Sequence, residues 1–554
     1  MRTALSDLGL LRAGTITPAA YTVQVGGGSF ADPIDRPDPA QGTSMRNQLE
    51  GSNVVLPDDA HNQRLVSNVH PPDWQNPTPS GRYNLVVVGG GTAGLVSAAG
   101  AAGLGAKVAL VEKHLLGGDC LVYGCVPSKA LIRAARAAAE VARAGQHGVR
   151  VPPGTTVDFP EVMQRMRRLR ADISPHDSAR RFMELGVDVF LGEACFTGPD
   201  TIQVGQHFLR FKKAVIATGA RALAPPIDGL SDVGYLTNET VFSLTELPQR
   251  LAIIGAGPIG CELAQAFARL GAQVELVEQG PKILQREDPD ASAMLHNALL
   301  DDGVRIHQNA QIERAGRSEA GKLLEVKQPE GQQRIVVDEI LVGAGRQPNV
   351  DGLGLEAAGI QFDRHTGVQT NDRLQTTNRR VFAAGDVCSR FKFTHAADAM
   401  ARIVIQNALF LGRAKASALA IPWCTYTDPE VAHVGLYPRE AEQRSLALDT
   451  FEVPLSSVDR AVLDGQTNGF VKLHVRKGTD RLVGATVVAA NAGDIIAELC
   501  LAITAGLGLR TLAKTIHPYP TQAEVVKRAA DAYSRSRLTP LVAGVFRKWL
   551  AWTR

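Results

Sequence analysis

Two cysteines stand close together directly before a stretch that predicts a helix. Cys120 and Cys125 are separated by four residues in GGDCLVYGCVPSKALIRAARAAAE, whose second half is rich in alanine. Cysteines at this spacing can close a small disulfide ring, and a nearby helix N-terminus or cation helps to hold one of them as a thiolate. No second cysteine or histidine pair lies nearby at zinc-site spacing, which disfavours zinc. The alternative to a redox pair is two buried cysteines that serve as small apolar side chains.

A glycine-rich turn lies just upstream of the cysteines. The segment YNLVVVGGGTAGLVSAAGAAGLGA predicts a buried strand, a turn with Gly89, Gly91 and Gly94, and a helix of small residues. The next predicted strand, KVALVEK, ends near Glu112, 18 residues after Gly94. Glycines let the backbone approach a pyrophosphate at a helix N-terminus, and such a carboxylate accepts hydrogen bonds from a ribose hydroxyl. The pattern predicts a dinucleotide site, the alternative being a purely structural turn.

The same unit recurs in RLAIIGAGPIGCELAQAFARLGAQVELVEQ. Gly255, Gly257 and Gly260 form the turn, and Glu278 follows 18 residues after Gly260. An enzyme with two dinucleotide sites is expected to pass a hydride between a nicotinamide and a flavin, because side chains cannot perform that chemistry. Glu278 favours NADH, since a carboxylate repels the 2′-phosphate of NADPH. Arg286 is the nearest cation after Glu278 whose charge would allow the 2′-phosphate of NADPH to bind.

Composition narrows the class of protein. The 554 residues suggest about three to four domains, and a net charge of +3 gives no field that would attract nucleic acid. Seven cysteines spread over this length do not form a secreted disulfide framework. No apolar run approaches the roughly 20 residues of a membrane-spanning helix, and the N-terminus lacks a signal-peptide pattern. We therefore expect a cytoplasmic enzyme that binds no nucleic acid.

Over roughly residues 81 to 540, the chain resembles the pyridine nucleotide–disulfide oxidoreductases, the family of dihydrolipoyl dehydrogenase, glutathione reductase and mercuric reductase. The resemblance rests on the cysteine pair with its trailing VPSK and on two dinucleotide fingerprints in the family's order. It also rests on AVIATGA with Gly219, on GAGRQPN with Gly345, and on RVFAAGDV with Asp386. It implies an α/β fold with two Rossmann-like domains, which bind FAD and NAD(P)H, and a C-terminal α+β dimerisation domain.

The resemblance also divides the chain. We expect a largely irregular N-terminal extension (1–80), followed by an FAD domain that carries the redox disulfide (81–228). An inserted NAD(P)H domain (229–350) and a second part of the FAD domain (351–421) come next. A dimerisation domain (422–540) and a basic tail (541–554) end the chain. Met45, near the middle of the extension, is a candidate translation start; the alternative is a real but floppy tail. In the family, a final loop of one subunit completes the active site of the other, which implies a homodimer.

Position by position, the resemblance assigns roles to five residues. Cys125 matches the thiol nearest the flavin, and Cys120 matches the interchange thiol that meets the substrate. Lys129 matches the lysine beside the reactive edge of the flavin, and Glu262 matches its carboxylate partner. Asp386 matches the residue that hydrogen-bonds the ribityl chain; the alternative is an ordinary turn aspartate.

The predicted final loop, HPYPTQAE, departs from the thiol-disulfide reductases. Those enzymes have a histidine before Pro-Thr, whereas this chain has Tyr519; Glu524 is kept, and His517 lies two residues too early. A phenol with a reference pKa of about 10 is a poor proton shuttle at neutral pH. Mercuric reductase also has tyrosine here, and soft thiolates such as those of Cys120 and Cys125 would transiently hold a soft substrate cation such as Hg(II).

Two features of mercuric reductase are absent, however. Residues 1 to 80 contain no cysteine, and the C-terminus lacks a vicinal cysteine pair. The expected acceptor is therefore a metal ion, as in mercuric reductase, or else a quinone or an unusual disulfide. The alternatives are a dihydrolipoyl dehydrogenase or other disulfide reductase, and a non-catalytic flavin redox sensor. We expect the terminal RLTPLVAGVFRKWLAWTR to form a helix packed on the dimer, the alternative being contact with a membrane surface.

Overall fold

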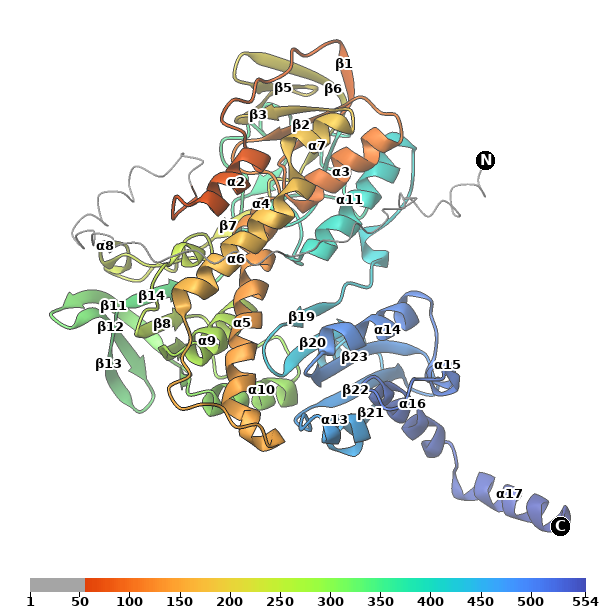
Figure 1. The fold of residues 1–554 in the computed structure, drawn as a ribbon. Helices are drawn as coiled ribbons and strands as arrows, with labels where there is room; N and C mark the ends of the chain where they lie inside the picture. Colours follow the sequence, from red (N-terminus) through yellow and green to blue (C-terminus); the bar gives the residue numbers. More distant parts are fainter. Residues whose placement is uncertain (1–54) are drawn as a thin grey trace, which may run out of the picture. The chain divides into compact units, whose positions relative to one another are not determined.

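The computed structural model describes residues 55–554, so Met45 and most of the predicted extension lie outside the described residues. The first sheet has the order β3-β2-β1-β6-β5-β4, with β18 also paired to β6 (Figure 1). Four of its strands run parallel to β1 or its neighbours: β2 (Val108–Glu112), β3 (Val187–Leu191), β6 (His207–Ile216) and β18 (Val381–Ala383). Strands β4 (Ala194–Gly198) and β5 (Thr201–Val204) extend it in antiparallel fashion. Because β18 pairs with β6, the chain returns to this sheet after the second sheet is complete.

The central strand β1 (Arg82–Val88) is an unbroken apolar run after Asn84, as expected of a strand covered on both faces. Helix α3 (Thr92–Gly103) follows it and packs against α11 (Thr394–Leu409). The sequence patterns that predicted this strand, turn and helix are confirmed.

The second sheet is wholly parallel. Its order is β10-β9-β8-β14, and its strands are β8 (Arg250–Ile254), β9 (Gln273–Val277), β10 (Arg305–His307) and β14 (Glu339–Val342). Helices α9 (Pro258–Arg269) and α10 (Pro289–Asp301) belong to it, and an antiparallel three-stranded sheet is inserted before β14: β11 (Gln311–Ser318), β12 (Gly321–Gln328) and β13 (Gly331–Val337). The α/β fold class with two Rossmann-like units is confirmed.

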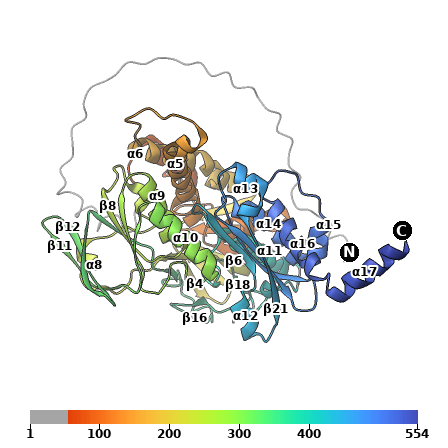
Figure 2. The ribbon, with the colours of Figure 1, turned by 90° about the horizontal axis from the view of Figure 1, so that it is seen from below.

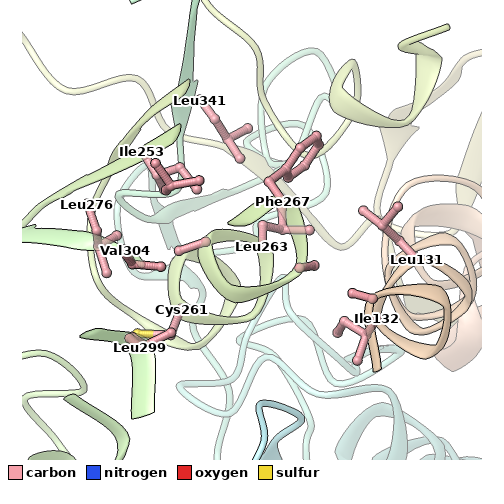
Figure 3. Close-up of a cluster of buried hydrophobic side chains, with 14 of the residues drawn as sticks. Leu131, Ile132, Ile253, Cys261, Leu263, Phe267, Leu276, Leu299, Val304 and Leu341 are labelled. Atoms are coloured by element: carbon pink, nitrogen blue, oxygen red, sulfur yellow. The ribbon is translucent and has the colours of Figure 1, made fainter. Parts of the chain in front are cut away.

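One hydrophobic core joins the cysteine-bearing helix to this second unit. Leu131 and Ile132 of α5 (Cys125–Arg143) lie in the same cluster as Leu263 and Phe267 of α9 (Figure 3). Both pairs are buried, so α5 and α9 hold each other in place. The first residue of α5 is thereby fixed relative to the second dinucleotide loop.

The C-terminal part contains an antiparallel sheet of order β19-β20-β23-β22-β21. Its strands are β19 (Trp423–Thr425), β20 (Glu430–Gly435), β21 (Leu448–Pro454), β22 (Phe470–Arg476) and β23 (Leu482–Ala489). Helices α14 (Ala492–Thr504) and α16 (Glu524–Ser536) pack on this sheet, while α13 (Asp459–Leu463), α15 (Leu509–Lys514) and α17 (Pro540–Trp552) complete the segment (Figure 2).

The prediction that residues 1–80 are largely irregular is wrong for Ala60–Val69, which form α2. Asp59 caps this helix by accepting from the backbone of Asn62, and Leu65 and Val69 are fully buried. The helix packs on α6 (Phe159–Ile173), where its buried polar Asn62 accepts from Arg170. A buried face that contains asparagine breaks the apolar periodicity on which the prediction relied.

Among residues 55–554, no helix is both long enough and apolar enough to span a membrane.

Candidate redox site

The two cysteines lie on two consecutive helices. Cys120 lies in the short α4 (Gly118–Val122), and Cys125 is the first residue of α5. Their side chains hydrogen-bond to each other as thiols, and a second hydrogen bond joins Cys125 Sγ to Thr394 Oγ1 at 3.4 Å. The first helical position places Cys125 at the positive end of the α5 dipole.

The environment shifts the pKa values of the two thiols in opposite directions. The hydrogen bond from Cys120, with help from Thr394 and Lys129, outweighs burial and lowers the pKa of Cys125 to about 6. The same hydrogen bond and burial raise the pKa of Cys120. Near neutral pH the reduced pair therefore consists of a Cys125 thiolate and a Cys120 thiol. This polarity agrees with the roles that the resemblance assigns to the two residues.

The cysteine loop touches the first dinucleotide loop. Gly118 has a φ of +56°, and a Cβ at this position would lie 2.8 Å from the Cα of Gly91. Only glycine allows both that backbone conformation and that approach. The start of the helix that contains Cys120 thereby touches the N-cap of α3.

The residues of the first loop fit a dinucleotide. A Cβ on Gly94 would lie 1.7 Å from the carbonyl oxygen of Gly89, so strand and helix pack as closely as the fingerprint requires. Gly91 is the N-cap of α3 and offers no side-chain cap, which leaves backbone N–H donors for a pyrophosphate. Glu112 ends β2 and accepts from the backbone of Gly90 (2.5 Å) and of His114 (2.7 Å). These features fit the adenosine and pyrophosphate of FAD.

The second loop has the same construction. A Cβ on Gly260 would lie 1.9 Å from the carbonyl oxygen of Gly255, and Gly257 caps α9 without a side-chain hydrogen bond. A pocket at this helix N-terminus is lined by residues of the loop and α9, of β14 and the segment after it, and by two residues from before β8: Gly257, Pro258, Ile259, Val342, Gly343, Gly345, Arg346, Ala222 and Asn238. The open helix end and the pocket fit a second dinucleotide, NAD(P)H.

Glu278 directly follows β9, the strand that comes after this second loop and its helix. Its carboxylate accepts from the backbone N–H groups of Ala256 (2.8 Å) and Gly280 (2.7 Å) and from Gln285 Nε2 (2.8 Å). These three donors hold a negative charge where an adenosine ribose of the nucleotide would lie. By contrast, the backbone carbonyl of Arg286 accepts from Arg439, and within residues 55–554 no hydrogen bond or ion pair joins the Arg286 guanidinium to Glu278.

An arginine links the cysteine loop to the segment that contains Asp386. Arg346 lies 3.0 Å from Asp119 Oδ2 and 3.9 Å from Asp386 Oδ2. Burial raises the pKa of Asp386. The motif GAGRQPN contains Arg346, but the sequence alone did not predict a role for this residue.

The neighbouring glycines shape the same region. Gly345 directly precedes Arg346 and has a φ of +148°, while the carbonyl oxygen of Gly219 accepts from the backbone of Asn349. Gly219 and Gly345 therefore lie on adjoining segments, close to the second loop and its pocket.

Lys129 and Glu262 meet as the resemblance implies. Lys129 Nζ lies 2.8 Å from Glu262 Oε2, and the other carboxylate oxygen accepts from the backbone N–H of Tyr426 at 2.8 Å. The Tyr426 ring lies under the ammonium, 4.6 Å from its centroid. Glu262 is buried, so three parts of the chain converge on one paired charge. Sequence reasoning did not single out Tyr426.

Tyr519 and Glu524 form their side-chain hydrogen bonds within the C-terminal part of the chain, and within residues 55–554 neither bonds to a cysteine. The Tyr519 hydroxyl donates to Asp459 Oδ2 at 2.9 Å, and this bond raises the pKa of the phenol. Tyr519 is 69% exposed. Glu524 begins α16, accepts from Arg528 Nε at 3.0 Å, and has a buried second oxygen that lacks a hydrogen-bond partner within residues 55–554. The third loop residue, His517, pairs with Glu498 at 3.0 Å.

Comparisons with known proteins match this architecture. Residues 83–401 match the family model described as pyridine nucleotide-disulphide oxidoreductase, and residues 421–530 match the model of that family's dimerisation domain. The chain is 35% identical over 459 residues to a mercuric reductase of Staphylococcus aureus, covering 82% of this chain and 83% of that protein. It is 33% identical over 462 residues to a dihydrolipoyl dehydrogenase of Thermus scotoductus, covering 82% and 98%.

Two solved structures are similar over nearly their whole length. One is the HOCl-induced flavoprotein disulfide reductase RclA from Escherichia coli, with 28% identity and a TM-score of 0.71 over 81% of this chain and 99% of that chain. The other is LpdA from Mycobacterium tuberculosis, with 27% identity and a TM-score of 0.74 over 81% and 99%.

Proposed function

The chain belongs to the pyridine nucleotide-disulphide oxidoreductases and is thus an oxidoreductase that uses FAD and NAD(P)H; we propose that it passes electrons through Cys120 and Cys125 to a metal ion, as in mercuric reductase. The observation that carries the choice of acceptor is the state of Tyr519. Its hydroxyl donates to Asp459, which raises its pKa, so the phenol stays protonated near neutral pH.

The protonated phenol of Tyr519 bears on which electron acceptor the enzyme can reduce. Reduction of a disulfide releases a thiolate that a nearby acid must protonate, and histidine is suited to this at neutral pH. Reduction of a soft divalent cation held by two thiolates needs two electrons and no proton on the acceptor. The balanced reaction is NAD(P)H + Hg(II) → NAD(P)⁺ + Hg(0) + H⁺. A protonated tyrosine is compatible with the second reaction and poorly suited to the first.

Different residues of the chain serve the nucleotide, the flavin and the acceptor. The first loop and Glu112 would hold FAD, which when bound would supply the chemistry for taking a hydride from NAD(P)H and delivering two electrons to the cysteine pair. Lys129, paired with Glu262, lies where the nicotinamide would dock beside the flavin. Arg346 holds the segment around Asp386 in place through its ion pair with that residue. Cys125 stays a thiolate beside Thr394, while Cys120 gives up its proton when it binds the metal.

We further propose a homodimer with shared active sites. The chain carries the family's dimerisation domain, and Tyr519 is mostly exposed in the single subunit. An exposed Tyr519 next to Glu524 suits a loop that completes the site of a second subunit around a two-fold axis. The preferred nucleotide is NADH, because the carboxylate of Glu278 would face a 2′-phosphate.

The test compares acceptors in the purified FAD-loaded protein. NADH and NADPH oxidation is measured with Hg(II) plus excess thiol, with lipoamide and with glutathione disulfide, in the native protein and in Cys120→Ala. Turnover with Hg(II) that is lost in Cys120→Ala supports the proposal. Turnover with lipoamide, or reduction of NAD⁺ by dihydrolipoamide, would instead assign dihydrolipoyl dehydrogenase activity. A flavin that NADH fails to reduce would favour the redox sensor.

A further inference from the structure

The last helix of the chain is apolar along one side and uncovered. Helix α17 begins at Pro540, with Thr539 as its capping residue, and none of its residues is buried. It follows α16 at the end of the chain (Figures 1 and 2) and lies beyond residue 530, where the match to the dimerisation domain ends. Val542 is half-buried, whereas six other large apolar side chains of the helix are each more than half exposed: Leu541, Val545, Phe546, Trp549, Leu550 and Trp552.

These side chains share one face. At about 100° per residue, the large apolar side chains fall on one half of the helix circumference. The opposite half carries a proline, three small residues and two cations: Pro540, Ala543, Gly544, Ala551, Arg547 and Lys548. Lys548 borders the apolar half and Arg547 lies nearer the middle of the opposite half; the long side chains of both can reach outward while their stems cover apolar surface.

The charge around this face has one sign. Residues 532–554 contain no aspartate or glutamate and five cations: Arg535, Arg537, Arg547, Lys548 and Arg554. None of these five forms an ion pair with another residue between 55 and 554, although the chain as a whole is nearly neutral at +3. A second copy of the helix, packed across a two-fold axis, would place like charges together. The complementary surface is therefore anionic as well as able to receive apolar side chains.

From these observations we propose that α17 docks the enzyme on the surface of an anionic lipid bilayer. The helix lies parallel to the bilayer plane, with Phe546, Trp549 and their apolar neighbours at the boundary between headgroups and acyl chains. Tryptophan suits that boundary because its ring is apolar and its N–H is polar. Arg547 and Lys548 meet the anionic headgroups. The docking is independent of the acceptor that the active site reduces.

The test uses the full-length FAD-loaded protein and vesicles of phosphatidylcholine with or without phosphatidylglycerol. We expect the protein to float with the anionic vesicles and to bind neutral vesicles at least about tenfold more weakly, with the same loss in high salt. Phe546→Ala should weaken binding about tenfold, because it removes one large side chain from the bilayer. Phe208→Ala is the matched control: this phenylalanine is 56% exposed against 53% for Phe546, but lies on β6.

Three outcomes would overturn the proposal. The first is the absence of flotation with anionic vesicles. The second is an equal loss in Phe546→Ala and Phe208→Ala, which would show that α17 is not the contact. The third is unchanged flotation in Phe546→Ala combined with a shift from dimer to monomer in light scattering, which would identify a second copy as the occupant. NADH oxidation should stay the same in both variants, so a failure here is distinct from a failure of the proposed reaction.

Discussion

Lys129 Nζ and the buried Glu262 carboxylate lie 2.8 Å apart, although 133 residues separate them in the chain. Helix α5 carries the lysine next to the cysteines, and α9 carries the glutamate behind the second dinucleotide loop. The backbone of Tyr426 fixes the carboxylate from a third direction. The pair thereby couples the position of the nucleotide-binding unit to the position of the redox helix.

Glu262→Gln tests this coupling. Glutamine keeps the shape and the acceptor for Tyr426 but leaves Lys129 without its counter-charge, so we expect flavin reduction by NADH to slow by roughly tenfold or more. Stopped-flow absorbance measures the rate. Glu339→Gln is the matched control, since it breaks a pair with Lys322 at 2.7 Å on β12 and β14. An equal slowing in both variants would show a general effect of charge on the fold.

The acidity of Cys125 gives a second prediction. Its lowered pKa, about 6, means that the reduced protein carries the thiolate above that pH and loses it below. The ultraviolet absorbance of the thiolate should therefore titrate with a midpoint near pH 6. Thr394→Val removes a hydrogen bond to the sulfur and should raise the midpoint by roughly one pH unit, whereas Thr394→Ser should keep it. A midpoint that is the same in all three proteins would exclude Thr394 from this role.

The parts of the site that sequence reasoning predicted are local. Strand, glycine turn, helix and a glutamate 18 residues later form a continuous pattern, and the structure places Glu112 and Glu278 against their loops as that pattern requires. The cysteine pair and its helix are equally local. Lys129 and Glu262 are distant in sequence, and only the family resemblance paired them.

The parts that were missed depend on contacts without local periodicity. Thr394 reaches Cys125 across 269 residues, and Asp459 reaches Tyr519 across 60. A hydroxyl or carboxylate at a helix start is common in any sequence, so nothing marked these two in advance. Helix α2 was missed because its buried face includes Asn62, whose burial makes sense only once Arg170 is placed opposite.

The hydrogen bond between Asn62 and Arg170 leads to a third prediction, which concerns the stability of the fold. Buried Arg170 donates to Asn62 Oδ1 and to the carbonyl oxygen of Val122, both at 2.6 Å, so α2 braces the segment between the two cysteines. Asn62→Leu should lower the free energy of unfolding by about 1–3 kcal/mol, because a buried guanidinium loses an acceptor. Urea unfolding measures the change. Ser67→Ala on the same helix removes an exposed hydrogen bond and should cost less than about 0.5 kcal/mol. Equal costs would contradict the bracing role.

Nucleotide preference gives a fourth prediction. Glu278→Ala removes the carboxylate that would repel a 2′-phosphate, so the ratio of kcat/KM for NADPH to that for NADH should rise by about tenfold, equivalent to about 1.4 kcal/mol. Steady-state oxidation of the two nucleotides measures the ratio. Glu112→Ala, at the matching position of the first loop, should instead weaken retention of FAD and leave the ratio unchanged. A ratio unaffected by Glu278→Ala would place the source of the preference elsewhere.

The last prediction concerns the phenol that distinguishes this chain from the disulfide reductases. Tyr519→His restores a group that titrates near neutral pH, so we expect lipoamide reduction to rise, with a pH profile that follows the histidine, while Hg(II) turnover falls. Asp459→Asn keeps a hydrogen-bond partner for Tyr519 but removes the charge that raises the phenol's pKa, and should change turnover by less than about threefold. Both variants should keep the rate at which NADH reduces the flavin, since Tyr519 bonds to Asp459 and not to Lys129 or Glu262. If Tyr519→His left both acceptor activities unchanged, the loop would not reach the reacting acceptor, and the shared-site dimer proposed above would be wrong.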